Sequence, residues 1–394
     1  MKLLVLFDNH YPEGLAMANR LQLYARALQS VGVEVTVLAG KYKKLQADKK
    51  VFMGHWYYSI DLSTPLDKIP FITRFTKGFA QKKLLMHLEA VSKDYDVIWS
   101  IGYTWKALLQ FSAICKKNNS KLIIELNEFP HSVIASRMQT EKGNERLRKK
   151  LFEQAYPVLD GFVVISDKLG NLAANYKSDS AKTIKVPILV DTHAYAEKEN
   201  IREKRFKAPF LFHAGTLTEE KDGILQVFEA FGRLSSKYPN FRFVLSNKVT
   251  LPHMIQQIDA VIDKYKIQDK VVFYSHLSRE AIHEHLSTCA CVVINKPDNL
   301  RNSYNFSTKL GECMSYGIPI VTTPVGEAAN YLMDEQNALL VNSTDVDAIC
   351  EKLSFILDHP DAAIQLGNNA MQTARQAFDH LNYAAALKSF LEQL

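Results

Sequence analysis

The run at residues 305–320, NFSTKLGECMSYGIPI, carries residue types that suit a nucleotide diphosphate. Ser307 or Thr308 can cap a helix that begins there, and the first turn of such a helix presents N–H groups to an anion. Lys309 adds a positive charge at the same end. Glu312 follows about one turn later and offers an acceptor for paired ribose hydroxyls. The spacing predicts a nucleotide-diphosphate site, and a plain capped helix before a Gly-Pro turn is the alternative.

Two glycine-containing segments follow predicted strands and precede predicted helices. The first, at residues 7–14, contains Gly14, which can bring bare backbone N–H groups close to an anion. The second, at residues 213–223, contains Gly215 and also Lys221, whose charge can neutralise a phosphate. The alternatives are a tight turn around Gly14 and a solvated Lys221.

The sequence contains no convincing motif for another cofactor or for a metal ion. The sequence has no GxGxxG after its first strand and no GxxxxGK[ST], which argues against a dehydrogenase and a P-loop kinase. His283 and His285 would point about 200° apart on a helix, so they cannot share one metal ion. The DxD sequences at residues 94–96 and 345–347 are predicted to enter or cap the elements that follow them. We therefore expect no metal and no cofactor.

Length, charge and cysteine content limit the class of protein. The 394 residues are enough for two domains or three. Residues 1–150 carry 24 Lys and Arg against 13 Asp and Glu, whereas residues 201–394 carry 19 against 22. The five cysteines form no CxxC pair, and no apolar stretch approaches the roughly 18 residues of a membrane span. These features predict a cytoplasmic protein whose two halves meet different partners.

Strands alternate with helices along both halves, which predicts α/β domains with doubly wound parallel sheets. The first half has predicted strands at residues 3–7, 34–38, 97–101, 122–126 and 161–165. The second half has six predicted strands between residues 210 and 341, with helices between them that include one at 327–332. We expect Rossmann-like domains at residues 1–195 and 196–375 that face each other across a cleft, joined by a charged linker at 197–207. A closing helix within residues 376–394 should pack back on the first domain.

With these elements in place, the sequence resembles the retaining family 4 glycosyltransferases of the GT-B architecture. The resemblance covers essentially the whole chain, and the run at 307–321 is close to the family form TKLxEyMaxGxPvv. It implies that Glu312 binds the donor ribose and that Lys309, the loop before it and Lys221 lie along the diphosphate. Gly14 corresponds to the N-terminal glycine-rich loop. The implied reaction takes a nucleotide-activated sugar and proceeds with retention and without a metal.

The resemblance also assigns residues by register and shows departures. Glu128 occupies the place of a family aspartate near the reacting sugar, with His131 nearby on the acceptor side. Thr216 stands where the family often has an arginine, and Tyr304 where many members have a glutamate. The expected catalytic residues are Glu128, Lys221 and Lys309, and the expected donor-binding residues are Gly14, Gly215, Thr216, Lys221, His276, Asn305, Ser307, Thr308, Lys309 and Glu312.

Basic residues are concentrated in the half where this architecture places the acceptor. One basic cluster lies among aromatic residues at 71–85, and another lies at 146–150. This pattern suits an anionic membrane surface, where lipid-linked acceptors of bacterial polysaccharide synthesis reside; a solvated helix face is the alternative. A net charge of only +6 and the lack of a nucleic-acid module argue against a nucleic-acid partner.

The function expected from the sequence is hexosyl transfer from a nucleotide-sugar donor to a saccharide or lipid-linked acceptor. The protein would act in the cytoplasm or peripherally on the inner face of the membrane. Two alternatives stay open. One is a nucleotide-sugar 2-epimerase of the same twin-Rossmann layout, which needs no acceptor, and the other is a degenerate, non-catalytic transferase that acts as a binding partner.

Overall fold

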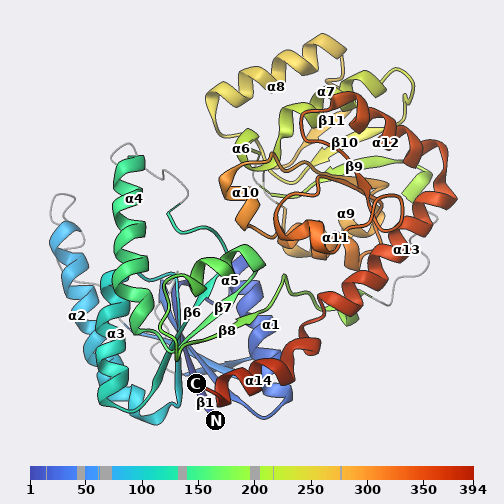
Figure 1. Cartoon of the computed structure of the whole chain (residues 1–394). Coiled ribbons are helices and arrows are strands. Elements are labelled where there is room, and N and C mark those ends of the chain that lie inside the picture. Colours follow the sequence, from blue (N-terminus) through green and yellow to red (C-terminus); the bar gives the residue numbers. More distant parts are fainter. Residues whose placement is uncertain are drawn as a thin grey trace. The chain divides into compact units, whose positions relative to one another are not determined.

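The structure is a computed structural model of the 394-residue chain. It describes residues 1–14, 16–41, 49–60, 62, 73–131, 140–195, 205–215, 217–275 and 277–394. The chain divides into two compact units (Figure 1): unit 1 comprises Met1–Leu189 and His380–Leu394, and unit 2 comprises Val190–Asp379. The boundaries between the units lie at residues 189/190 and 379/380, whereas the sequence predicts domain boundaries after residues 195 and 375. Most of the expected linker at 197–207 lies outside the described residues.

Unit 1 is built on an eight-stranded sheet. Its strands lie in the order β3-β4-β2-β1-β5-β6-β7-β8, and neighbours are parallel except for the β3–β4 pair. The apolar run after Lys2 makes β1 a buried central strand. The bounds are β1 (Lys2–His10), β2 (Glu34–Lys41), β3 (Lys50–Phe52), β4 (His55–Ser59), β5 (Val97–Ile101), β6 (Lys121–Leu126), β7 (Gly161–Val164) and β8 (Lys182–Lys185).

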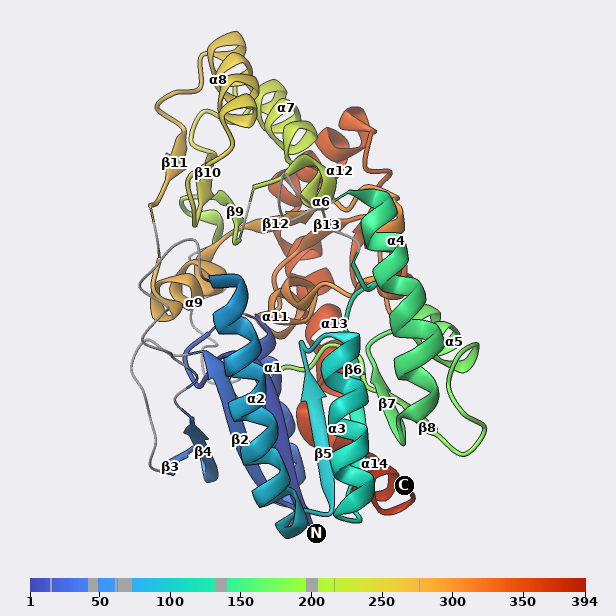
Figure 2. The same cartoon turned by 90° about the vertical axis from the view of Figure 1, so that its left-hand side faces the viewer.

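Helices cover both faces of this sheet. Figure 1 shows α1 and α14 on one face and α2 and α3 on the other, and Figure 2 shows α2 and α3 in front of the strands. Leu387, Phe390 and Leu391 of α14 join the apolar cluster that contains alternate residues of β1, so the C-terminal helix is part of the core of unit 1. The bounds are α1 (Ala16–Ser30), α2 (Thr73–Val91), α3 (Trp105–Lys117), α4 (Glu141–Lys150), α5 (Asp167–Ala174) and α14 (Ala384–Glu392).

Unit 2 has a six-stranded, entirely parallel sheet in the order β11-β10-β9-β12-β13-β14. Its strands are β9 (Phe210–His213), β10 (Arg242–Leu245), β11 (Val271–Phe273), β12 (Cys291–Ile294), β13 (Ile320–Thr322) and β14 (Leu339–Leu340). Its helices are α6 (Glu219–Asp222), α7 (Ile224–Leu234), α8 (Pro252–Tyr265), α9 (Arg279–Thr288), α10 (Leu300–Tyr304), α11 (Thr308–Ser315), α12 (Val346–Asp358) and α13 (Pro360–Ala377). Two doubly wound sheets of mainly parallel strands confirm the predicted fold class.

Some predicted elements differ from the structure. The helix expected at 327–332 is a 3-10 helix at Gly326–Asn330. The edge strand β8 was not predicted, because its sequence KTIK has no apolar run. Helix α13 was not predicted either, since Gly367 interrupts its pattern of helix-forming residues. A Cβ atom at Gly367 would lie 2.1 Å from the carbonyl oxygen of Gly317, so this glycine lets α13 pack directly against the turn that follows α11.

Candidate functional site

Two loops of unit 2 leave its sheet at the same point. β9 and β12 are neighbours, and the chain order runs outward from them in opposite directions, to β11 on one side and to β14 on the other. Parallel α/β sheets bind ligands outside the carboxyl ends of their strands at such a reversal of order. The loop that contains Gly215 follows β9, and Asn295 and Lys296 follow β12. The topology therefore brings together side chains that are far apart in the sequence.

A buried carboxylate connects these loops. Asp222 ends α6, and its Oδ1 atom is 3.1 Å from Nζ of Lys296 and 3.1 Å from Nζ of Lys309. The exposed fraction of the side chain is 3% for Asp222, 9% for Lys296 and 22% for Lys309. Two cations thus share one carboxylate oxygen. We call these three residues the lysine cluster.

The charges of the lysine cluster shift one another's titration. Burial alone would raise the pKa of Asp222, but the positive charges of Lys309, Lys296 and His213 outweigh burial and lower that pKa to about 2. Burial lowers the pKa of Lys296 to about 8; Asp222 opposes this change, whereas Lys309 and Lys221 add to it. Strongly perturbed groups of this kind are common at ligand sites.

Two glycines are required by close contacts around the lysine cluster. Gly215 has a φ of +113°, and a Cβ atom there would lie 2.9 Å from Cε of Lys309. The missing side chain therefore allows Lys309 to lie directly on the loop backbone. Gly223 has a φ of +50°, and its carbonyl oxygen accepts a hydrogen bond from Nδ2 of Asn295 at 2.8 Å.

Side chains from the segment after β12 hold the short helix α6. Nζ of Lys296 donates to the carbonyl oxygen of Lys221 at 2.9 Å. The carbonyl oxygen of Glu220 accepts from Nδ2 of Asn299 at 2.8 Å and from Nδ2 of Asn302 at 3.2 Å. Side chains satisfy these carbonyl groups because a four-residue helix leaves its last carbonyls without partners inside the helix. These roles were not predicted; the only signal in the sequence is the density of Asn and Lys after the strand.

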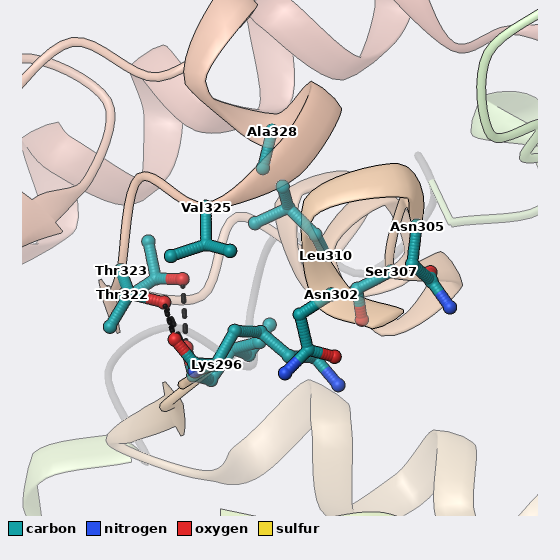
Figure 3. A pocket seen from close by; sticks show the side chains of 10 residues that line it. Lys296, Asn302, Asn305, Ser307, Leu310, Thr322, Thr323, Val325 and Ala328 are labelled. Atoms are coloured by element: carbon teal, nitrogen blue, oxygen red, sulfur yellow. Dashed lines mark hydrogen bonds between the residues drawn. The ribbon is translucent and has the colours of Figure 1, made fainter. Parts of the chain in front are cut away.

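The first turn of α11 borders a small cavity (Figure 3). Ser307 occupies the N-cap position, and its side chain makes no capping hydrogen bond to the N–H groups of this turn. The N–H of Leu310 donates to the carbonyl oxygen of Ser307 at 3.0 Å. The cavity has a volume of about 10 Å³, which is room for about one water molecule. Its lining consists of Ile294, Lys296, Asn302, Asn305, Ser307, Leu310, Thr322, Thr323, Val325 and Ala328.

Glu312 lies on α11, three residues and therefore slightly less than one turn after Lys309. Within the described part of the chain, no hydrogen bond reaches its carboxylate. Burial raises the pKa of Glu312, and the positive charges of Arg279 and Lys309 oppose that shift. A part-buried carboxylate with unused acceptor positions can receive hydroxyl donors from a ligand.

In unit 1, Gly14 follows the end of β1. A Cβ atom there would lie 2.6 Å from Cβ of Ala18 and 2.9 Å from the carbonyl oxygen of His10. The close approach of β1 and α1 is by itself a sufficient reason for glycine at this position. The structure therefore agrees with the tight-turn alternative and leaves the anion-binding role of Gly14 a prediction.

Glu128 and His131 follow β6 in unit 1. Glu128 is exposed, and His131 has a φ of +51°. The carbonyl oxygen of His131 accepts from Nη1 of Arg148 at 3.0 Å, and the Arg148 guanidinium lies 5.5 Å from the ring centroid of Phe129. Burial, and then the positive charge of Arg148, lower the pKa of His131. These residues belong to unit 1, whereas Gly215, Lys221, Lys309 and Glu312 come together within unit 2.

The remaining predicted positions are of three kinds. Thr216 and His276 lie outside the described residues. Asp345, in the second DxD sequence, accepts from the backbone N–H of Ala348 at 2.9 Å and so caps α12 as predicted. The rings of His283 and His285 contact different neighbours, Tyr316 and Phe212 respectively, in agreement with their predicted divergence.

Comparison with protein families and solved structures agrees with this architecture. Residues 195–373, which span the lysine cluster and Glu312, match the family model described as "Glycosyl transferases group 1". No curated protein matches the sequence significantly.

Three solved structures illustrate the shared fold. The sucrose-phosphate synthase of Thermosynechococcus elongatus has a TM-score of 0.75 at 17% identity, covering 100% of this chain and 98% of that chain. The Anabaena protein Alr3699/HepE, solved with UDP-glucose, has a TM-score of 0.70 at 16% identity, with both chains covered completely. Trehalose-6-phosphate synthase OtsA has a TM-score of 0.70 at 14% identity, covering 100% and 99%. The chain therefore has the GT-B fold with two Rossmann-like domains, and its residues 195–373 are similar to the glycosyl transferases group 1 family.

Proposed function

We propose that this protein is a retaining, metal-independent glycosyltransferase that uses a nucleoside-diphosphate sugar. The observation that carries the proposal is the lysine cluster with Glu312 inside the group 1 domain. Excess positive charge at the loops suits a diphosphate, and the Glu312 carboxylate suits ribose hydroxyls. The UDP-glucose complex of the Anabaena relative supports a nucleotide-sugar donor.

The proposed reaction breaks the bond between the anomeric carbon and the diphosphate oxygen. The acceptor hydroxyl forms its new bond to that carbon on the same face, and its proton passes to the departing diphosphate. Lys221, Lys309 and the first turn of α11 stabilise the negative charge that develops on the leaving group. Glu128 would stabilise positive charge on the sugar or orient the acceptor, with His131 on the acceptor side. Positioning and electrostatic stabilisation would supply most of the rate enhancement.

A nucleotide-sugar panel tests this reaction against its alternatives. The full-length protein is incubated with UDP-, GDP- and ADP-sugars, with and without saccharide and lipid-linked acceptors, and in the presence and absence of a chelator. Acceptor-dependent release of nucleoside diphosphate is the expected result, unchanged by the chelator. Epimer formation without an acceptor would instead identify an epimerase, and binding without turnover a non-catalytic protein.

The acceptor is proposed to be lipid-linked and to belong to cell-surface polysaccharide synthesis. None of the described helices combines the length and the apolar character that a membrane crossing requires. On α2, however, Phe79 and Met86 are 55% and 63% exposed, and Lys82 and Lys83 between them are exposed as well. Spacing of three, four and seven residues places these side chains on one helix face. Such a face suits peripheral binding to an anionic membrane.

The second basic cluster fits a membrane less well. Lys150 lies 5.0 Å from the ring centroid of Trp105, and Arg148 is bonded to Glu141 at 2.6 Å, so both charges are engaged within unit 1. In the first cluster, the side chains of residues 71–77 lie outside the described set. The membrane proposal therefore depends on the exposed face of α2.

Liposome flotation tests the membrane proposal. The protein should float with vesicles that contain anionic lipid and should remain in the lower fraction with neutral vesicles. Phe79→Ser combined with Met86→Ser should reduce flotation severalfold. Phe355→Ser is the matched control, because Phe355 is an exposed apolar residue of unit 2, at 37%. Equal flotation with both lipid compositions would rule out electrostatic docking.

A further inference from the structure

Lys296 is a buried cation that contacts residues of the proposed anion site. Its side chain is 9% exposed, and its Nζ atom lies 2.9 Å from the carbonyl oxygen of Lys221 and 3.1 Å from Oδ1 of Asp222. Lys221 and Lys309 are the two proposed diphosphate-binding lysines. Lys296 therefore contacts the backbone of the first and the carboxylate that pairs with the second. A charged lysine is costly to bury, and an apolar side chain could fill the same space at lower cost.

Asp222 links this buried cation to the more exposed one. Its Oδ1 atom receives both ammonium groups, while Oδ2 is buried and has no hydrogen-bond partner among the described atoms. The carboxylate holds Nζ of Lys309 at 3.1 Å, and the backbone of Gly215 lies under the same side chain. Removing either Asp222 or the charge of Lys296 would alter the position of Lys309 and the net charge of the loops.

We propose that Lys296 and Asp222 are positioning residues of the anion site: while Lys296 carries its proton, the pair holds Lys309 on the Gly215 loop and fixes the backbone of Lys221. The inference rests on the proposed function, because it takes a diphosphate as the ligand of Lys221 and Lys309. Neither Lys296 nor Asp222 needs to touch the ligand. Both would change its affinity through the arrangement and charge of the residues that do.

The groups that face Lys296 determine the pH range of this effect. Asp222 and Lys221 on α6 and Lys309 on α11 act on Lys296, and His213 after β9 acts on Asp222. With a pKa of about 8, Lys296 loses its proton as the pH rises from 7 to 9. The lysine cluster then carries one positive charge fewer, so the affinity for an anion should fall over this range.

Isothermal titration calorimetry with inorganic pyrophosphate and with UDP tests the proposal on the full chain. Wild-type protein should bind pyrophosphate about tenfold more weakly at pH 9 than at pH 7, the size expected for one charged hydrogen-bonding group. Lys296→Met should bind about tenfold more weakly at pH 7 and should show no further fall in affinity toward pH 9. Lys296→Arg should bind at both pH values with the affinity that the wild type has at pH 7, because a guanidinium stays charged. A purely structural lysine would not give this rescue at pH 9.

A second variant and a control complete the test. In Asp222→Asn the fall in affinity should begin at lower pH, because the carboxylate no longer stabilises the charged form of Lys296. Lys270→Met is the control, since Nζ of Lys270 donates to the carbonyl oxygen of Ser235 at 2.7 Å at the amino end of β11. It should bind both ligands like the wild type. Far-UV circular dichroism checks that each variant is folded. If Lys296→Met does not fold, the pH dependence of Lys296→Arg provides the test.

The two ligands separate this inference from the proposed function. If UDP and pyrophosphate bind Lys296→Met as they bind the wild type at both pH values, the positioning role is wrong while the nucleotide site stands. If pyrophosphate binding depends on Lys296 but no nucleotide binds, the anion site is supported and the proposed donor is wrong. If neither ligand binds the wild type, both proposals are overturned.

Discussion

The two units both bury charged side chains, but they compensate them differently. In unit 1, Nε of Arg20 donates to Oε1 of Glu125 at 2.6 Å, and its other two nitrogens donate to Tyr24 and to the carbonyl oxygens of Val186 and Pro187. One cation meets one carboxylate, and protein atoms accept from all three nitrogens. In unit 2, by contrast, two lysines share one oxygen of a single carboxylate.

This difference indicates what each charged group is for. A buried cation whose three nitrogens all donate to protein atoms serves the fold, because any change leaves a partner uncompensated. A set of cations that outnumbers its carboxylates, with Lys309 partly exposed, suits an anion from outside. Substitutions in unit 1 should therefore change stability, whereas substitutions in the lysine cluster and its neighbours should mainly change ligand binding.

The largest effect is expected from breaking the balanced pair of unit 1. Arg20→Met should lower the free energy of unfolding by about 3–5 kcal/mol, because it leaves Glu125 buried without a cation. Urea unfolding followed by tryptophan fluorescence measures this unit, since the protein's three tryptophans, Trp56, Trp99 and Trp105, all lie in it. The ring of Trp99 lies 4.8 Å from that of Tyr24, centroid to centroid, and so reports on the same region.

A double variant serves as the control for this prediction. Arg20→Met with Glu125→Leu should recover most of the lost stability, because it removes both charges together. An unchanged urea midpoint in the single variant would contradict the structural role assigned to the pair.

The next largest effect is expected at the proposed donor contacts of unit 2. Lys221→Ala and Glu312→Ala should each lower turnover by about 10²- to 10³-fold, the size seen when a group that stabilises transition-state charge is removed. Sugar transfer is measured with the donor identified by the panel. Lys237→Ala is the matched control, because Lys237 forms an exposed ion pair with Asp358 at 2.8 Å and should be dispensable. Full turnover by a folded Lys221→Ala or Glu312→Ala variant would refute the donor site.

A smaller effect is expected from adding one methyl group to the loop. Gly215→Ala should weaken diphosphate binding about tenfold, because its Cβ atom would meet Cε of Lys309 at 2.9 Å and its φ of +113° disfavours a side chain. Calorimetry with UDP provides the affinity. Gly170→Ala in unit 1 is the control, since its Cβ atom would meet only Val164 at an ordinary 3.5 Å. Equal UDP affinity in both variants would show that Lys309 does not depend on this close approach.

The smallest effect concerns stability in acid. Because the pKa of Asp222 is about 2 in the folded protein, below its ordinary value of 3.8, its contribution is complete above pH 4 and is lost as the pH falls toward 2. Between pH 6 and pH 3, the wild type should lose about 1 kcal/mol more stability than Asp222→Asn. Urea unfolding followed by far-UV circular dichroism at both pH values measures the difference. Parallel losses in the two proteins would mean that Asp222 is not a stabilising partner of the lysines.

Much of the local structure could be predicted from the sequence. The strand predicted at residues 97–101 coincides with β5, and those predicted at 122–126 and 161–165 differ from β6 and β7 by one residue at one end, because each begins or ends where an apolar run meets polar or turn-forming residues. The strands β3, β4 and β8 were not predicted, since they are short and lie toward the edges of the sheet of unit 1. Edge strands need no long apolar run, so their sequences do not stand out.

The candidate site could be predicted only in part. Gly215, Lys221, Lys309 and Glu312 could be named as candidates, because each stands at a characteristic distance from a strand end or a helix start. Lys296 and Asp222 were not, because neither belongs to a local pattern. Their significance depends on an ion pair of 3.1 Å between loops that follow different strands.

The sequence by itself thus determined the alternation of strands and helices, the two-sheet fold class and the residue types that would suit a diphosphate. Only the tertiary structure decided which charges neutralise one another. The physical reason is that periodicity and spacing act over a few residues, whereas ion pairing depends on which strands are neighbours in a sheet. β9 and β12 are far apart in the chain but adjacent in unit 2, and their adjacency places one carboxylate between two lysines.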